Sequence, residues 1–379
     1  MNLDEYLEKM KKIQEKLLDY LESNKKNETL HNILEDTRFH EDRYELISLL
    51  HFVLRISNNH HRDDIFDSKI EEILRFFKED IKTKIPNSEL FHIFKSNKKI
   101  LLFLHQEGLF KFDNQITKII TQKKYVKAHY PQYFSPEIRE FLDDKWYPKV
   151  LKEEDCFPKK LEEEDWFTKG LPENFNEKRI KGENDDYICE LIQKDLIDDF
   201  VKYVNQVSYP LDSIINQSIY ETNNFLLKEE EISLIEYAVF YGSIQIFNFL
   251  KLNEVKLTPS LWLYAIHGKN GDIIHSLEEN SINPNNNSYK ECLNESIKCH
   301  HNDIANYILD HYLSNEKENL NDIMVNSLKY YNLYFEQKDL INESSFFYLC
   351  KYDYYIPVTI LLNEKDIDIN TTIIYAIKI

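Results

Sequence analysis

The chain has few residues of the kinds that break helices or form turns. Only 6 of its 379 residues are glycine and 10 are proline, whereas 42% are hydrophobic and 13% aromatic. Disordered chains lack the apolar and aromatic residues needed to bury a core, so this composition excludes one. With few turn residues and many Leu, Ile and Lys, the composition favours an all-α fold.

Cysteine is also scarce, and its pattern is irregular. The five cysteines are odd in number and irregularly spaced, which is typical of reduced thiols in a cytosol rather than of a disulfide framework. The N-terminus has no apolar signal segment, and no run approaches the ~20 apolar residues that cross a bilayer. We therefore expect a cytoplasmic protein with no membrane insertion.

Arginine is absent from residues 181–379, where 31 acidic residues face 15 lysines for a net charge of −16. The whole chain carries −19, so the first 180 residues are nearly balanced at −3. A nucleic-acid binder normally presents a basic face to the phosphates. The acidic residues 181–379 would repel nucleic-acid phosphates. We therefore expect no nucleic acid as a partner and favour a basic protein.

Residues 2–22 show an amphipathic helical pattern, with Leu and Ile recurring every three or four residues. Such a stripe forms either a coiled-coil seam between two chains or a packing face on its own domain. We expect the second arrangement, and therefore a monomer rather than a homodimer. Further helices are predicted at residues 44–55 and 70–81.

Three regions follow from the composition. Residues 1–130 form an N-terminal helical region, in which residues 88–108 resemble a degenerate helical hairpin ending at a Gly108 cap. Residues 131–182 form an acidic connector that holds half of all the prolines. Its aromatic residues Phe157, Trp166 and Phe167 either pin the connector to the repeats, which we favour, or offer a docking point to a partner.

The sequence pattern of residues 183–379 predicts repeated helix pairs. The clearest pair begins at Ser233, turns at Gly242 and ends before Thr258-Pro259, which opens the next pair. A small residue recurs at intervals of 27, 31 and 31 residues, at the position where the helices of a pair approach: Ala238, Ala265, Ser296 and Ser327. The pattern resembles the ankyrin repeat, with its Thr-Pro opening, Gly turn, apolar second helix and period of about 33 residues.

The end of the chain resembles the start of another repeat. The segment TTIIYAIKI has Ala376 at the small-residue position and stops after one helix. Because a repeat array usually ends in a polar cap, we expect an incomplete last repeat, a truncated or unusual C-terminus, and fraying there.

Several longer phrases resemble the large family of ankyrin-repeat proteins encoded by trichomonad protists, which carry an uncharacterised domain of unknown function. The resemblance covers roughly residues 88–310 and is carried by these runs: NKKILLFLHQEG, KRIKGENDDYICELIQKD, SIYETNNFL, LIEYAVFYGSIQIF, TPSLWLYAIHGKN and ESIKCHHNDIANYI. It implies a cytoplasmic interaction scaffold and no particular mechanism.

The sequence contains no recognisable catalytic or cofactor-binding motif. Gly268 and Gly271 lack the Gly-Lys-Ser/Thr ending of a phosphate-binding loop. The one candidate metal cluster is Cys292, Cys299, His300 and His301. The two cysteines fit core positions and His300 fits the turn, so we expect no metal, no cofactor and no catalytic residue there.

The sequence therefore predicts an all-α ankyrin solenoid preceded by a helical region. Its expected function is that of a non-enzymatic scaffold that binds a protein partner through the concave face and loop tips of the repeats. Two alternatives remain open: a regulatory or enzymatic activity in residues 1–130, and a structural protein that associates with itself. The sequence identifies neither the partner nor the residues that bind it.

Overall fold

A computed structural model describes residues 2–23, 27–34, 37–61, 64–142, 171–229, 231–314, 320–335 and 345–364. These residues form helices and no strand, apart from an isolated antiparallel bridge between Ile214 and Ser233. The prediction of an all-α fold is confirmed. Most of the predicted connector and the final segment 365–379 lie outside the described residues, as do Phe157, Trp166, Phe167 and Ala376.

The chain forms two compact units that do not follow the order of the sequence. The first unit combines residues 1–84 with 239–242 and 257–379, and the second combines 85–238 with 243–256. In the first unit, helices from the beginning of the chain therefore share a core with helices from its end. The divisions at residues 130 and 182 stay predictions.

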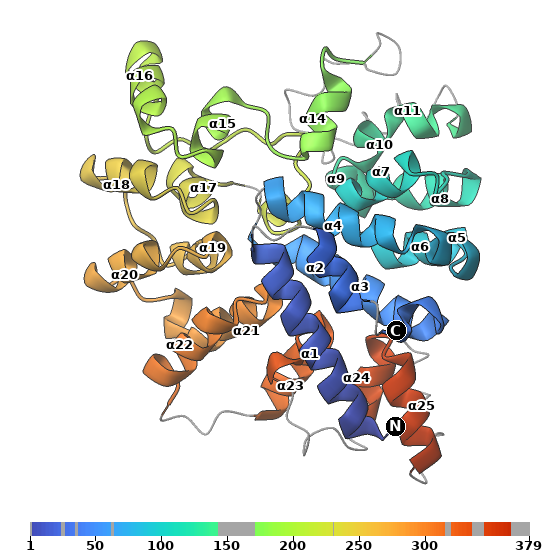
Figure 1. The fold of residues 1–379 in the computed structure, drawn as a ribbon. Coiled ribbons are helices and arrows are strands. Elements are labelled where there is room, and N and C mark those ends of the chain that lie inside the picture. The colour runs from blue at the N-terminus through green and yellow to red at the C-terminus, as the bar shows by residue number, and fades with distance from the viewer. Residues whose placement is uncertain are drawn as a thin grey trace. The chain divides into compact units, whose positions relative to one another are not determined.

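The first unit contains most of the long helices (Figure 1). Its N-terminal helices are α1 (Leu3–Glu22), α2 (Asn27–Leu34), α3 (Arg43–Asn59), α4 (Asp64–Phe76) and α5 (Lys78–Lys84). Its C-terminal helices are α19 (Leu261–Gly268), α20 (Gly271–Glu279), α21 (Tyr289–Cys299), α22 (Asn302–Tyr312), α23 (Leu320–Tyr330), α24 (Phe346–Lys351) and α25 (Tyr355–Glu364). The helix predicted at 70–81 is two helices, because α4 ends at Phe76 and α5 begins at Lys78.

Helix α1 begins at a capping box, in which Asn2 and Glu5 each accept a hydrogen bond from the other's backbone amide. Its apolar stripe is buried within the first unit, where α1 packs against α4 and α25. The polar Gln14 is buried too, and its side chain accepts a hydrogen bond from the amide of Leu333 at 3.1 Å. The stripe is thus covered by helices of its own chain.

Several helices of the second unit pack against their neighbour in the sequence. Its described helices include α6 (Asn87–Phe94), α7 (Lys98–Gln106), α8 (Asn114–Ile120), α9 (Lys123–Lys127), α10 (Tyr130–Tyr133), α11 (Ser135–Ile138), α14 (Phe175–Lys181), α15 (Tyr187–Gln193), α16 (Ile197–Val207) and α18 (Ile244–Leu252), while α17 (Leu234–Phe240) contributes residues to both units. The predicted hairpin at 88–108 corresponds to α6 and α7, which pack together, and Gly108 adopts the left-handed conformation of a cap (φ +71°).

The same tight turn closes several helix pairs. The residue after the left-handed position donates its amide to a carbonyl five residues earlier: Ser243 to Ala238 at 2.9 Å, His301 to Ser296 at 3.0 Å and Asn332 to Ser327 at 2.9 Å. These acceptors are three of the small residues that the sequence singled out, and all four of that set are buried. The turn conformation satisfies carbonyls that the end of a helix leaves without a partner.

Polar side chains at these turns also reach back to the preceding pair. Within the second unit, the Ser243 hydroxyl donates to the Ile192 carbonyl at 2.5 Å. Within the first unit, the corresponding bonds run from Asn270 to Gly242 at 3.0 Å, from His301 to Ile266 at 2.7 Å and from Asn332 to Ile297 at 2.9 Å. Each bond sets the register between one turn and the turn before it.

Candidate functional site

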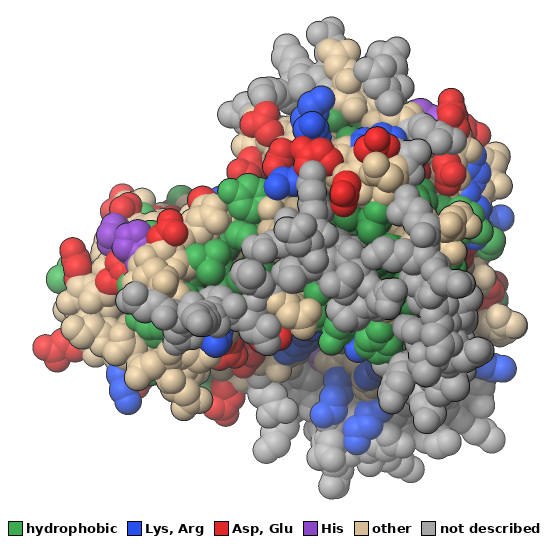
Figure 2. All heavy atoms as spheres, turned by 90° about the horizontal axis from the view of Figure 1, so that it is seen from below, with side chains coloured by type: hydrophobic (Ala, Val, Ile, Leu, Met, Phe, Trp, Pro, Cys, Tyr) green, Lys and Arg blue, Asp and Glu red, His purple; other side chains and the backbone are tan. Residues whose placement is uncertain are grey.

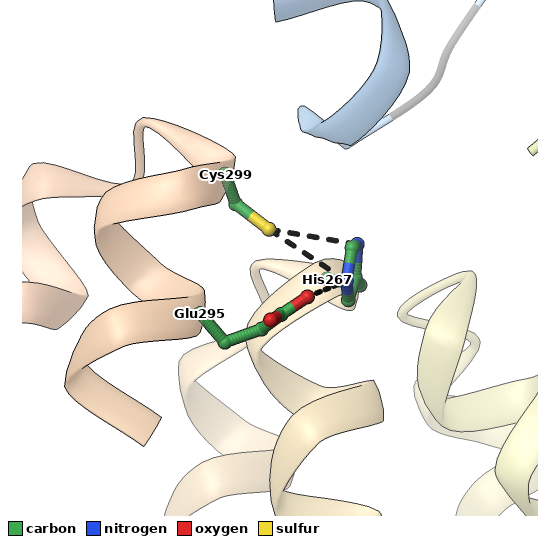
Figure 3. A group of neighbouring side chains, drawn as sticks. All are labelled: His267, Glu295 and Cys299. Carbon is green, nitrogen blue, oxygen red and sulfur yellow. Dashed lines mark hydrogen bonds and ion pairs between the residues drawn. The ribbon is translucent and has the colours of Figure 1, made fainter. Parts of the chain in front are cut away.

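Three ionisable side chains of the first unit converge on one point (Figure 3). Glu295 and Cys299 lie four residues apart on α21 and so share one face of that helix. His267 lies near the end of α19, which packs against α21. The Nε2 atom of His267 is 2.7 Å from Glu295 Oε1, and Cys299 Sγ is 3.5 Å from Nδ1 and 3.7 Å from Nε2.

Burial sets the protonation of this cluster. Cys299 and His267 are 0% and 1% exposed, and burial raises the pKa of the Cys299 thiol well above its usual value. Burial also lowers the pKa of His267, although Glu295 opposes that effect. For Glu295, burial alone would raise the pKa, but His267 and Lys298 lower it to about 2. At neutral pH the cluster therefore holds a thiol, a neutral imidazole and a carboxylate.

This protonation and burial exclude the obvious catalytic interpretation. A cysteine nucleophile reacts as a thiolate and needs contact with its substrate. Cys299 is a thiol with no exposed surface, so it does not act as one in this conformation. The arrangement can instead bind an ion or stabilise the packing of α19 on α21.

Further residues contact Glu295 and His267 from outside the cluster. The Lys298 ammonium lies 2.5 Å from Glu295 Oε1, and the ring of Phe240 stacks on the imidazole of His267 with centroids 5.4 Å apart. A backbone hydrogen bond with Asn59, at the end of α3, acts to raise the pKa of His267. The cluster therefore connects helices from both ends of the chain within the first unit.

Histidines also occupy the neighbouring turns. The ring of His60 lies edge-on to His301 at 4.7 Å, and its Nε2 atom is 2.9 Å from a Glu22 carboxylate oxygen. Lys269 approaches the same oxygen at 2.8 Å. Burial tends to raise the pKa of Glu22, but hydrogen bonds from His60 and Lys269 lower it to about 2. This group joins the end of α1 to the ends of α3 and α19.

The four residues that the sequence offered as a metal cluster do not converge. Cys299 is in the cluster of Figure 3, whereas His300 donates to the Tyr330 carbonyl at 2.9 Å and His301 to the Ile266 carbonyl at 2.7 Å. His300 occupies the turn, as expected, with φ +58°. Cys292 is buried elsewhere on α21, where burial raises its pKa to about 12.

Sequence analysis missed His267 and Glu295. The spacing of Glu295 and Cys299 was visible, because four residues place them on one helical face. The position of His267, 28 residues before Glu295, depends on the packing of α19 against α21. Predicting His267 at the site would have required knowing how one helix pair stacks on the next.

The second unit contains a small cavity of ≈ 30 Å³, lined by residues that include Asn184, Ser218, Glu221 and Tyr237. That volume accommodates about one or two water molecules and no substrate. Among the described residues, no helix combines the length and apolar character needed to cross a membrane. Comparisons with protein families, with curated proteins and with solved structures found no match to this chain.

Proposed function

We propose that this protein is a non-enzymatic scaffold of the ankyrin-repeat type that binds a basic protein partner in the cytoplasm. The observation that carries the proposal is the recurring turn, at which Ala238, Ser296 and Ser327 accept the same backbone hydrogen bond. Each helix pair then bonds to the turn before it through a polar side chain. In repeat proteins, neighbouring units bury one another's apolar faces in this way and leave the turns and outer helices for partners.

Exposed acids support the choice of a basic partner. The second helices of three pairs begin with exposed aspartates, at Asp198 and Asp199 on α16, Asp272 on α20 and Asp303 on α22. Acidic side chains near a helix N-terminus are also favourable for the helix itself. On the face drawn in Figure 2, acidic side chains are exposed with lysines and arginines among them. Acidic residues nevertheless outnumber basic ones over residues 181–379, where the net charge is −16.

The cysteines support the cytoplasmic part of the proposal. The four that lie within the described residues are free: Cys189, Cys292, Cys299 and Cys350. Three of them are buried, and buried free cysteines are typical of a reducing compartment rather than of a disulfide-bonded secreted protein.

The test uses the full chain and two variants of equal charge change. The first replaces the four exposed aspartates Asp198, Asp199, Asp272 and Asp303 with asparagine. The control replaces four exposed glutamates elsewhere with glutamine: Glu15, Glu79, Glu140 and Glu173. Each chain is immobilised and exposed to lysate of the source cells at low and high salt, and retained proteins are identified by mass spectrometry.

We expect the wild type and the control to retain the same basic protein, more weakly at high salt because the attraction is screened. The aspartate variant should retain it at least several-fold less. A protein retained equally by all three chains would contradict a role for these four aspartates in binding. The absence of any protein retained above an empty support would contradict the scaffold itself.

A further inference from the structure

We propose that His267, Glu295 and Cys299 form a zinc-binding site inside the first unit. Each residue offers one ligand atom, and these atoms all lie within 4.8 Å of one another. Nitrogen, carboxylate oxygen and sulfur are the three donor types that zinc binds in proteins, and a site with three protein ligands keeps a fourth position for water.

The distance between the sulfur and the imidazole Nε2 fits a shared zinc ion. Tetrahedral zinc at its usual bond lengths separates a sulfur ligand from a nitrogen ligand by about 3.6 Å, and a nitrogen from an oxygen by about 3.3 Å. The observed Sγ to Nε2 distance is 3.7 Å. Glu295 Oε1 lies 2.7 Å from Nε2, so zinc at Nε2 would replace this hydrogen bond and would bind the other oxygen, Oε2.

The surroundings orient the ligands. A zinc-bound histidine usually donates its second ring N–H to a backbone carbonyl or a carboxylate, which fixes the ring. The backbone of Asn59, a hydrogen-bond partner that acts to raise the pKa of His267, would be the acceptor for that N–H. Lys298 holds one oxygen of Glu295, which leaves the other oxygen for a metal. The stacked ring of Phe240 limits rotation of the imidazole.

Zinc binding releases one proton from the site. Zinc binds the Cys299 sulfur as thiolate, and the thiol proton leaves to solvent. The neutral imidazole donates its single N–H proton in a hydrogen bond from Nε2 to Glu295 before binding; on binding, that proton moves to Nδ1, zinc takes Nε2, and Glu295 binds as the carboxylate it already is. The ion can reach the site along Glu295 and Lys298, whose side chains are 16% and 14% exposed.

The expected consequence is structural. Zinc at this point would tie α19 to α21 directly and would hold the end of α3 through Asn59. This goes beyond the proposed scaffold function, because the metal would stabilise the first unit whether or not a partner binds the exposed aspartates. Metal that binds only the folded chain raises its stability by mass action.

The experiment titrates Co²⁺ into the full, tag-free chain after treatment with a chelator. Cobalt replaces zinc in tetrahedral sites, and a cobalt–thiolate bond gives an intense near-ultraviolet absorption band. We expect this band to saturate at one Co²⁺ per chain and to disappear when Zn²⁺ is added. A hundredfold excess of Zn²⁺ over its Kd should also raise Tm by roughly 5 °C.

The matched variants lie on one helix. Cys299→Ser should lose the band, whereas Cys292→Ser, equally buried on α21, should keep it. Glu295→Gln keeps the shape of the side chain and should weaken Co²⁺ binding by at least tenfold. If Cys299→Ser does not fold, Glu295→Gln decides the question. A wild type without the band would overturn the proposal, as would a folded Cys299→Ser that keeps it or unchanged affinity in Glu295→Gln.

Discussion

A Cβ atom on Gly268 would lie 2.1 Å from the carbonyl oxygen of Val239. Both residues belong to the first unit, and the contact brings the end of α19 against the last turn of α17. That separation is far below any ordinary contact, and the obstructing atom is backbone, so no side-chain rotation relieves it. The close approach of these two segments therefore requires glycine at position 268.

We predict that Gly268→Ala destabilises the protein by about 3 kcal/mol, because the backbone must shift to admit the methyl group. Gly271→Ala is the control. A Cβ there meets nothing within 4 Å, so its effect should stay within about 0.5 kcal/mol. Urea unfolding followed by circular dichroism measures both. Equal stability of the two variants would show that α19 does not approach Val239 so closely.

The Asn332 side chain makes a second test of the turns. It is 1% exposed and donates to the Ile297 carbonyl at 2.9 Å and to Asn302 Oδ1 at 2.8 Å. Asn332→Ala leaves one buried and one half-buried acceptor without this donor, so we expect a loss of about 2 kcal/mol. Asn326→Ala, on the more exposed face of α23, should cost less than about 1 kcal/mol in the same unfolding measurement. If Asn332→Ala lost as little stability as Asn326→Ala, the hydrogen bonds between successive turns would be contradicted.

An ion pair in the second unit joins the two sides of the segment 143–170. Arg179 and Glu137 form two parallel hydrogen bonds, at 2.7 and 2.8 Å, and their side chains are 6% and 9% exposed. Glu137→Gln leaves a buried guanidinium without its counter-charge, for an expected loss of about 3 kcal/mol.

The matched control is Glu71→Gln, which removes the exposed pair with Arg75 on α4. Exposed pairs within one helix contribute about 0.5 kcal/mol or less. Thermal or urea unfolding of the two variants should therefore differ clearly. If Glu137→Gln were as stable as the control, the pair at Arg179 would not be buried in the way described.

Buried histidines should make the first unit sensitive to acid. Burial lowers the pKa of His51 and of His300 to about 3, whereas the unfolded value is about 6.5. The unfolded chain therefore takes up protons first as pH falls. Stability is fully present above about pH 6.5 and declines below it, by about 2 kcal/mol per histidine at pH 5.

The variant His51→Phe tests whether His51 makes the protein less stable as the pH falls. The replacement keeps a ring to stack on Tyr331, as His51 does at 5.2 Å, and removes the titration. Its stability should change less between pH 7 and pH 5 than that of the wild type, by about 2 kcal/mol. His275→Gln, at a side chain that is 72% exposed, should follow the wild type. A His51→Phe profile parallel to the wild type would mean that His51 is not held neutral.

The sequence by itself determined the local features. The stripe predicted at 2–22 became α1 at 3–22, because three- and four-residue spacing places apolar side chains on one helical face. The hairpin at 88–108 and its Gly108 cap also followed from near neighbours in the chain. Such features depend on interactions within about one helical turn, which a single sequence displays directly.

Tertiary structure alone decided which distant segments meet. The N-terminal helices share a unit with α19 to α25, although more than 170 residues separate them, and no local pattern indicated that pairing. His267 reaches Cys299 only because α19 packs on α21. Apolar faces are largely interchangeable as partners, since hydrophobic burial has no direction. The choice among them is made by shape, by close approaches such as Gly268 to Val239, and by buried polar groups that need particular partners.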